Sequence, residues 1–303
     1  MRKFLMFLFC VLVGLIIWKK DIISRFIFQK IIYRDTVVLE SANQYYRSNE
    51  FSLAKSTTDF IIKDNKSFLD IIYTVLNNGW KEITIFCDYT YETCQEDFLS
   101  FIEDTTYAEI INNYVNPFNS YNNMNFTIDS LGKITIKIDK IYNDYQIEQV
   151  SKKIDAFINE NIQANMNDRG KIKLFHDYII NKTKYDEEYD LNTDKNSYQY
   201  HPYNAYGPVI EGLGICSGYS DAMAIFLDKV GIPNYKISSK DHVWNLVYLE
   251  GTWYHLDLTW DDPVTSNGQE VILYDFYLIT TKELYSKNTT QHNFNPTFYP
   301  EAA

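Results

Sequence analysis

The sequence predicts an α+β fold in which a small mixed domain precedes a second domain that carries the chemistry. Apolar residues recur at helical spacing in some segments and alternate along strands in others. A glycine-flanked cysteine, Cys216, begins one of the helices, and two strand-like runs follow it. We therefore expect a helix packed on an antiparallel sheet in residues 146–303, after a small α+β domain in residues 26–145 and an apolar helix in residues 1–25.

The N-terminal helix is predicted from the uncharged segment Phe4–Trp18, which has basic residues on both sides. It is slightly short for a membrane span, which needs about 17 to 25 residues, and it also fits the apolar part of a signal peptide. A buried terminal helix is the third possibility. Because no small-residue cleavage site follows, we favour an uncleaved signal anchor. The flanking charges leave its orientation open, but the acidic remainder of the chain fits a single-pass cell-membrane protein whose catalytic domain lies outside the cytoplasm.

Composition excludes some classes of function. Hydrophobic residues make up 46% of the chain and charged residues 22%, which is typical of a globular protein rather than a disordered one. The net charge is −12, so a phosphate backbone would find no basic face, and we expect no nucleic-acid partner.

The cysteines and histidines predict no metal site and no cofactor, because their spacings do not resemble zinc motifs. Cys87 and Cys94 form a local disulfide if their domain faces an oxidising space, or otherwise remain two free thiols. Cys10 lies within the apolar helix, so Cys216 is left without a partner.

In the first domain the periodicity predicts a helix over residues 66–76, a strand over 82–86 and one or two helices over 98–115. Two alternating runs, 124–128 and 133–138, flank the turn Asp129-Ser130-Leu131-Gly132, which predicts a hairpin. A helix over residues 150–162 then connects the two domains.

The second domain begins with a helix over residues 171–181, capped by Asn167-Asp168. His176 on this helix is expected to be a hydrogen-bonded packing residue. A polar loop over residues 185–197 is long enough to border a site.

Cys216 is the candidate nucleophile. It lies in the segment Gly214-Ile215-Cys216-Ser217-Gly218, and a run with helical spacing follows and ends at Gly231-Ile232-Pro233. The free N–H groups and the positive dipole end of a helix stabilise a thiolate at such a position. The glycines let backbone and substrate approach closely.

Two β-rich runs, 242–249 and 252–260, flank Glu250-Gly251 and predict an antiparallel hairpin with a two-residue loop. If Leu249 pairs with Thr252, His242 and Asp257 are diagonal neighbours on one face, with about 7 to 8 Å between their backbones. Side chains can close that gap to a hydrogen bond. A loop of another length would place the two residues on opposite faces.

These three residues have the chemistry of a nucleophile, a base and an orienting acid. His242 takes the proton of Cys216 and later returns it to the leaving amine, and Asp257 holds the imidazole tautomer. The backbone N–H of Cys216 is one oxyanion donor, and Tyr206 is a candidate for the second.

Tryptophans flank these residues along the hairpin. Trp244 and Trp253 share the predicted face of His242 and are candidates for the wall of a substrate cleft. Trp260 points away and is expected to pack in the core. Asp261 and Asp262 are expected in a turn or a solvated cap rather than at a cation.

The motifs GICSGYS, HVWN and WYHLDLTWDDP resemble those of the transglutaminase-like superfamily, which shares its core with papain-like thiol proteases. The resemblance extends from about residue 171 to the C-terminus and includes FHDYIINKTKYD and PYNAYG, which are similar to the lead-in of bacterial members. It implies a papain-like transglutaminase core with Cys216 as nucleophile, His242 as base and Asp257 as the third member. The tryptophan that helps to form the oxyanion hole in animal transglutaminases has no assignable counterpart.

The expected function is that of a membrane-anchored thiol enzyme that forms an acyl-enzyme on protein glutamine or peptide amides. Amine attack then gives transamidation, and water gives deamidation or hydrolysis. A cysteine peptidase of the same fold is the alternative within this class. A non-catalytic scaffold that binds a protein partner is the alternative outside it. Presence of all three site residues favours the enzyme.

Overall fold

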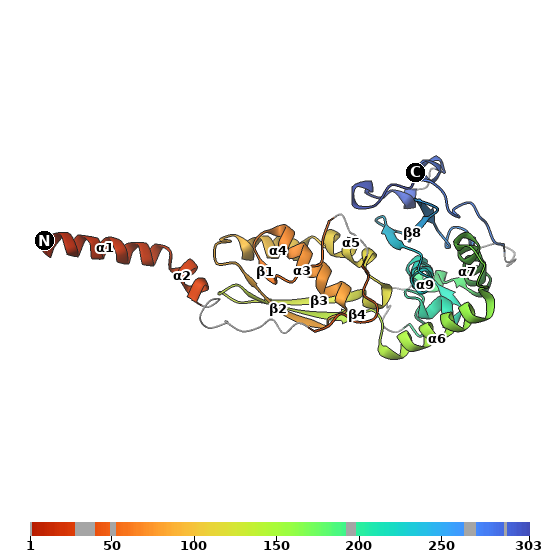
Figure 1. Cartoon of the computed structure of the whole chain (residues 1–303), viewed down its shortest axis with the longest axis horizontal. Helices are drawn as coiled ribbons and strands as arrows, with labels where there is room; N and C mark the ends of the chain where they lie inside the picture. Colours follow the sequence, from red (N-terminus) through yellow and green to blue (C-terminus); the bar gives the residue numbers. More distant parts are fainter. Residues whose placement is uncertain (1, 28–39, 49–52, 192–197, 264–270, 288–289) are drawn as a thin grey trace.

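The computed structural model describes residues 2–303 apart from residues 28–39, 49–52, 192–197, 264–270 and 288–289. The molecule is elongated, with an N-terminal helical segment at one end, a sheet with helices in the middle and the C-terminal region at the other end (Figure 1). The predicted α+β class is confirmed by this mixture of helices and sheets.

The N-terminal segment consists of helices α1 (Arg2–Trp18) and α2 (Lys20–Ile27). Within the described residues, no helix combines the length and the apolar character needed to cross a membrane. The predicted transmembrane anchor in residues 1–25 is therefore not supported.

Helix α3 (Asn65–Asn78) begins at a capping box formed by Asp64 and Ser67 and ends at Gly79, whose φ of 76° suits glycine. Its predicted core, residues 66–76, is confirmed. The buried face of α3 includes Ile71, Val75 and Leu76.

A four-stranded sheet forms the middle of the molecule, with the order β1 (Ile61–Ile62), β2 (Glu82–Cys87), β4 (Lys133–Lys140) and β3 (Tyr121–Ile128). The predicted hairpin is strands β3 and β4, and Gly132 in its turn has a φ of 81°. Alternate residues of β2 and β4 are buried, which leaves the other face toward solvent. Helices α3, α4 (Cys94–Glu103) and α5 (Thr106–Tyr114) lie along one side of this sheet (Figure 1).

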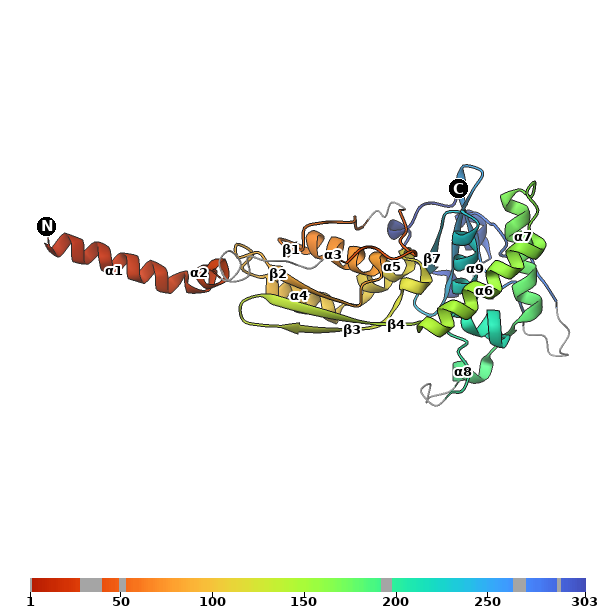
Figure 2. The ribbon, with the colours of Figure 1, turned by 60° about the horizontal axis from the view of Figure 1, so that its bottom comes forward.

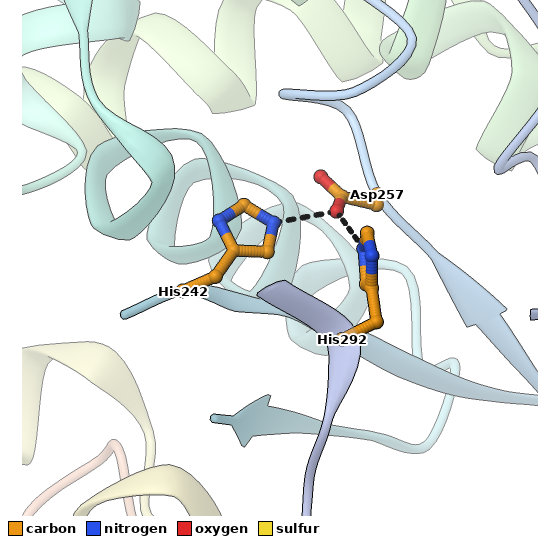
Figure 3. A group of neighbouring side chains, drawn as sticks. All are labelled: His242, Asp257 and His292. Atoms are coloured by element: carbon orange, nitrogen blue, oxygen red, sulfur yellow. Dashed lines mark hydrogen bonds and ion pairs between the residues drawn. The ribbon is translucent and has the colours of Figure 1, made fainter. Parts of the chain in front are cut away.

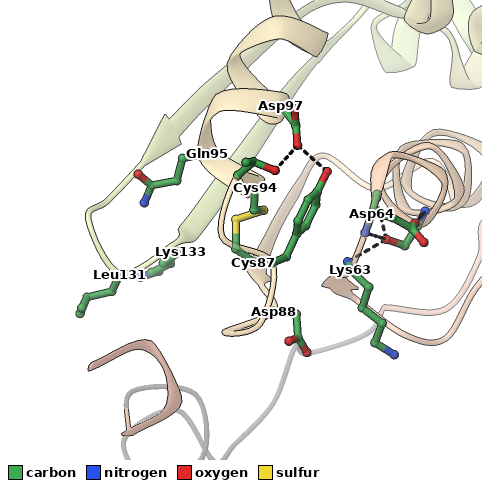
Figure 4. The surroundings of a disulfide bond; sticks show 12 residues. Lys63, Asp64, Cys87, Asp88, Cys94, Gln95, Asp97, Leu131 and Lys133 are labelled. Carbon is green, nitrogen blue, oxygen red and sulfur yellow. Dashed lines mark hydrogen bonds between the residues drawn. A yellow bond between two sulfur atoms is a disulfide. The ribbon is translucent and has the colours of Figure 1, made fainter. Parts of the chain in front are cut away.

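Cys87 and Cys94 form a disulfide, which decides between the two alternatives left open by the sequence. The bond joins the end of β2 to the start of α4 (Figure 4). The hairpin turn packs directly on it, because a Cβ added at Gly132 would lie 2.9 Å from the Cβ of Cys87.

Helices α6 (Asp144–Asn161) and α7 (Asp168–Lys182) follow, and both have asparagine N-caps, Asn143 and Asn167. The capping box of Asn143 with Gln146 starts α6 six residues before the predicted position, since the amphipathic pattern becomes clear only further along. In Figure 2, α6 and α7 lie beside α9 (Cys216–Lys229) in the C-terminal region.

The second sheet has the order β7 (Asn234–Ser238), β8 (Val243–Leu249) and β9 (Thr252–Leu256). Leu249 pairs with Thr252, as predicted. The turn residues Glu250 and Gly251 have φ values of 55° and 92°, which match the twist that a two-residue hairpin loop requires. Helix α9 packs against β7 and β8.

The four-stranded sheet with its helices (residues 40–140, the first region) and the part of the chain that follows it (the second region) share one hydrophobic cluster. It contains residues of the first sheet and its helices together with Tyr235, Trp244 and Leu246 of the second sheet. The opposite face of the second sheet packs on α9 through Val247 and Leu249. Both faces of β8 are therefore covered.

Short elements complete the structure. They are η2 (Pro117–Asn119), β5 (Lys184–Tyr185), α8 (Glu187–Leu191), η4 (Gly207–Glu211), β6 (Leu213–Gly214), α10 (Thr281–Ser286), η5 (Thr290–His292) and η6 (Pro296–Phe298).

Candidate active site

Cys216 is the first residue of α9, as the sequence predicts. Its half-buried thiol is one of two free cysteines in the described residues, and Cys10 is the other. Ile215 before it is extended, so the chain turns sharply into the helix and leaves the first N–H groups of the helix near the thiol.

A segment that precedes Cys216 in the sequence wraps around the start of α9. The N–H of Ile215 donates to the carbonyl of Pro202 at 3.0 Å, and Ser217 Oγ donates to the carbonyl of Tyr203 at 2.8 Å. A Cβ at Gly218 would lie 2.2 Å from the Pro202 oxygen, so only glycine fits there. These contacts explain both Gly218 and the PYNAYG segment, because the two pack against each other at the start of α9.

His242 and Asp257 come together as the hairpin register requires (Figure 3). His242 Nε2 lies 2.6 Å from Asp257 Oδ2, and both side chains are buried. Cys216 also interacts with this imidazole, and the interaction acts to raise the pKa of His242. The three residues therefore form a continuous chain from the thiol to the carboxylate.

The environment of His242 favours its charged form. Burial lowers its pKa, but the charge and hydrogen bond of Asp257, together with those of Cys216, outweigh burial and raise the pKa to about 10. Burial also acts to raise the pKa of Asp257, yet the interactions with His242 and His292 hold it well below its usual value. The imidazolium form of His242 is thus favoured at neutral pH.

The Asp257 carboxylate accepts four hydrogen bonds. Oδ1 accepts from the backbone N–H groups of Thr259 and Trp260, at 3.0 and 3.2 Å. Oδ2 lies 2.6 Å from His242 Nε2 and 2.8 Å from His292 Nε2. The sequence analysis missed His292, which is 35 residues from Asp257 with no local motif to mark it.

His255 is a neutral neighbour of this group. Burial and the adjacent His292 lower its pKa to about 3. Consistent with a neutral ring, its Nδ1 accepts a hydrogen bond from Trp244 Nε1 at 3.0 Å.

A cleft of about 430 Å³ opens at the thiol. It is bordered by the candidate site, the start of α8, and the chain that follows β9. Its lining residues are Tyr185, Glu187, Cys216, Asp241, His242, Thr259, Trp260, Asp262, Pro263 and Gln291. The loop predicted to border the site contributes Tyr185 and Glu187, although part of it folds as α8 and residues 192–197 lie outside the described part.

Trp244 and Trp253 were predicted to form the wall of a substrate cleft, but neither residue lines this cleft. Trp244 is 1% exposed and lies in the cluster shared with the first region, where Trp253 stacks on Tyr235. Both side chains do lie on the predicted face of the hairpin, but the first region covers that face. Trp260 borders the cleft instead and donates from Nε1 to Gln291 Oε1 at 3.1 Å.

Tyr206 does not line the cleft, so its prediction as oxyanion donor is not supported. Its ring contacts Tyr145 and His201. The N–H of Cys216 at the start of α9 remains the candidate donor.

The acidic pair after Trp260 lies in the turn that follows β9, which confirms the first of the two predicted settings, but neither carboxylate is a solvated cap. Asp261 is buried and lies 3.2 Å from His176 Nε2, which confirms His176 as a hydrogen-bonded packing residue. Asp262 accepts a hydrogen bond from the Tyr219 hydroxyl at 2.5 Å and lines the cleft.

His242, Asp257 and His292 also have the composition of a metal site, with ligand atoms within 4.8 Å of one another. Both imidazole Nε2 atoms are already directed at Asp257 Oδ2. A cation there would have to replace both hydrogen bonds, so the geometry is explained by the hydrogen bonds alone.

Comparison with known proteins gives one family match, which spans Cys216, His242 and Asp257. Residues 155–258 match the family model of the transglutaminase-like superfamily. No curated protein matches the chain. Similar solved structures include a transglutaminase with 18% identity and a TM-score of 0.32, and a protein from Cytophaga hutchinsonii assigned as a cysteine protease, with 12% identity and a TM-score of 0.28. Each covers 50% of this chain, and the match spans 46% and 65% of those two chains.

Proposed function

We propose that the protein is a thiol enzyme that forms an acyl-enzyme at Cys216 on an amide of a protein or peptide, and the match of residues 155–258 to the transglutaminase-like family model supports this. The observation that carries the proposal is His242, which lines one cleft with Cys216, interacts with it, and is hydrogen-bonded to Asp257. In a scaffold, the strongly buried charge of this pair would have a desolvation cost and no use.

The proposed reaction has two steps. The Cys216 sulfur attacks the amide carbonyl, the C–N bond breaks, and the leaving amine or ammonia takes a proton from His242. A primary amine or water then attacks the thioester, His242 takes its proton, and the sulfur leaves. The N–H at the start of α9 stabilises the oxyanion in both steps. An amine gives an isopeptide bond, whereas water gives deamidation or peptide hydrolysis.

The first test is alkylation of Cys216 by iodoacetamide, followed by mass spectrometry across pH. We expect a fast reaction that persists at pH 6 in the wild type and is lost in His242→Ala. Cys10 in the same chain is the internal control for an ordinary free thiol. A Cys216 that reacts no faster than Cys10, and equally in His242→Ala, would contradict the proposal.

Amine incorporation into a glutamine-containing protein, ammonia release and peptide cleavage then separate the three reaction types. Each is compared with Cys216→Ala. Cys216→Ala with full biological effect and unchanged partner binding would instead support the scaffold alternative.

We further propose that the enzyme works outside the cytoplasm. The Cys87–Cys94 disulfide supports this, since such bonds persist in oxidising spaces. Protease added to intact cells should degrade the chain if this is right, and a protected chain in the cytoplasmic fraction would exclude it. The same fractionation tests the predicted membrane attachment.

A further inference from the structure

His292 contacts the same carboxylate oxygen as the candidate base. An ionised carboxylate has only acceptors, so both His242 Nε2 and His292 Nε2 must carry a hydrogen and donate to Asp257 Oδ2. Figure 3 shows the two rings approaching Asp257 from different elements. His292 comes from η5, near the C-terminal end of the chain.

The surroundings of His292 fix its orientation. The side chain is 1% exposed, and its ring stacks on Phe276 at 5.0 Å with an angle of 14° between the planes. The indole of Trp244 meets it edge to face at 4.9 Å, and Trp260 lies 5.3 Å away. A ring enclosed in this way cannot turn its Nε2 donor away from Asp257.

The position of this donor matters for His242. Backbone N–H groups hold Oδ1 of Asp257, but Oδ2 has only the two imidazoles as donors in the described contacts. Without His292, the buried carboxylate would be left short of a donor and would rotate or admit water. Either change weakens the hydrogen bond to His242.

We propose that His292 is a positioning residue, which holds Asp257 Oδ2 toward His242 and thereby maintains the His242–Cys216 pair. The inference rests on the proposed function of that pair. The titratable groups that face His292 and Asp257 come from several elements: His242 before β8, His255 in β9 and Asp261 in the turn after it.

Two substitutions separate donation from packing. His292→Phe keeps a ring against Phe276 but removes the donor. His292→Gln loses the ring but places an amide N–H near the position of Nε2. The control is His201→Gln, at a histidine that does not line the cleft and hydrogen-bonds Glu211.

Three quantities are measured on the full chain: the melting temperature, the alkylation rate of Cys216 at pH 7, and the NMR titration of His242. We expect His292→Phe to slow alkylation about tenfold, which corresponds to the loss of one charge-assisted hydrogen bond, and to move the His242 titration to lower pH. His292→Gln should retain most of both properties, and His201→Gln should match the wild type.

A His292→Phe variant with wild-type alkylation and an unchanged His242 titration would overturn the proposal. Equal losses in the Phe and Gln variants that follow their melting temperatures would also overturn it, because they would indicate packing only. Failure of the proposed function has a different signature, namely a wild-type Cys216 that is insensitive to His242→Ala. In that case the His242 titration in His292→Phe still decides the role of His292.

Discussion

The first and second regions of the molecule bury different kinds of polar side chain. In the described part of residues 40–140, every buried polar side chain except that of Arg47 is neutral. The neutral ones are Thr74, Asn77, Asn113, Asn116, Asn119 and Ser120. In the second region many are ionisable, and they include His176, Asp186, Asp221, Lys236, His242, His255, Asp257, Asp261 and His292.

This difference separates structural from chemical uses of buried polarity. The asparagines satisfy backbone groups without a desolvated charge: Asn119 Nδ2 donates to the carbonyl of Asn77, and Asn77 in turn bonds the backbone of Arg47. Buried charge has a high desolvation cost, and replacing it with apolar groups often stabilises a protein. In the second region one such group, the pair His242 and Asp257, interacts with Cys216 and can act on the thiol.

The largest expected effect tests the charge of the second region. Asp257→Asn keeps the shape of the side chain but removes the negative charge that holds His242 protonated. We expect Cys216 alkylation at pH 7 to fall about 10³-fold, within the range for loss of a general base. Asp155→Asn, at a half-exposed carboxylate paired with Lys229, is the control. Equal alkylation rates in the two variants would show that the buried charge of Asp257 does not act on Cys216.

Arg47→Ala tests the buried charge that belongs to the first region. Arg47 pairs with Asp228 at 2.8 Å and also donates to the carbonyl of Tyr114 and to Asn234. Removing one partner of a buried pair costs about 3 kcal/mol. Urea unfolding should show this loss, with Cys216 alkylation in the folded protein unchanged.

The matched variant for that experiment is Arg169→Ala, at an exposed arginine paired with Glu250. It should change stability little, because exposed pairs contribute little. A similar loss in both variants would mean that burial of Arg47 has no special importance.

Cys94→Ser tests whether the first region is stabilised without affecting the site. The disulfide closes a short loop, for which chain entropy gives about 2.5 kcal/mol of stabilisation. We expect a loss of that size in urea unfolding and an unchanged Cys216 alkylation rate. Cys10→Ser should leave both unaltered. A change in alkylation of Cys216 in Cys94→Ser would show that the two regions are coupled.

The pH dependence of stability that His242 confers tests whether this buried residue is charged in the folded protein. Its pKa in the folded protein, about 10, lies above its usual value, so the folded state keeps a proton that the unfolded chain has lost. This stabilisation is complete below pH 6.5 and disappears as the pH rises through about 10. Between pH 7 and 10, the melting temperature of the wild type should fall more steeply than that of His242→Ala, because only the wild type loses this proton from the folded state. Parallel curves would mean that His242 is not protonated in the folded state.

Local patterns predicted much of the site. The two-residue loop Glu250-Gly251 determines the parity of the hairpin, and that parity brings His242 within reach of Asp257. The prediction failed at Trp260 for an equally local reason. Strand β9 ends at Leu256, and a turn in which Asp257 Oδ1 accepts the N–H groups of Thr259 and Trp260 replaces the alternation.

By itself, the sequence determined that Cys216 starts a helix and that His242 and Asp257 share a face of one hairpin. Helix starts and hairpin registers follow from residues close together in the chain. Only the tertiary structure decided that the first region covers Trp244, that Trp260 borders the cleft and that His292 completes the contacts of Asp257. These outcomes depend on how distant segments pack, and no short-range pattern of residue types encodes that packing.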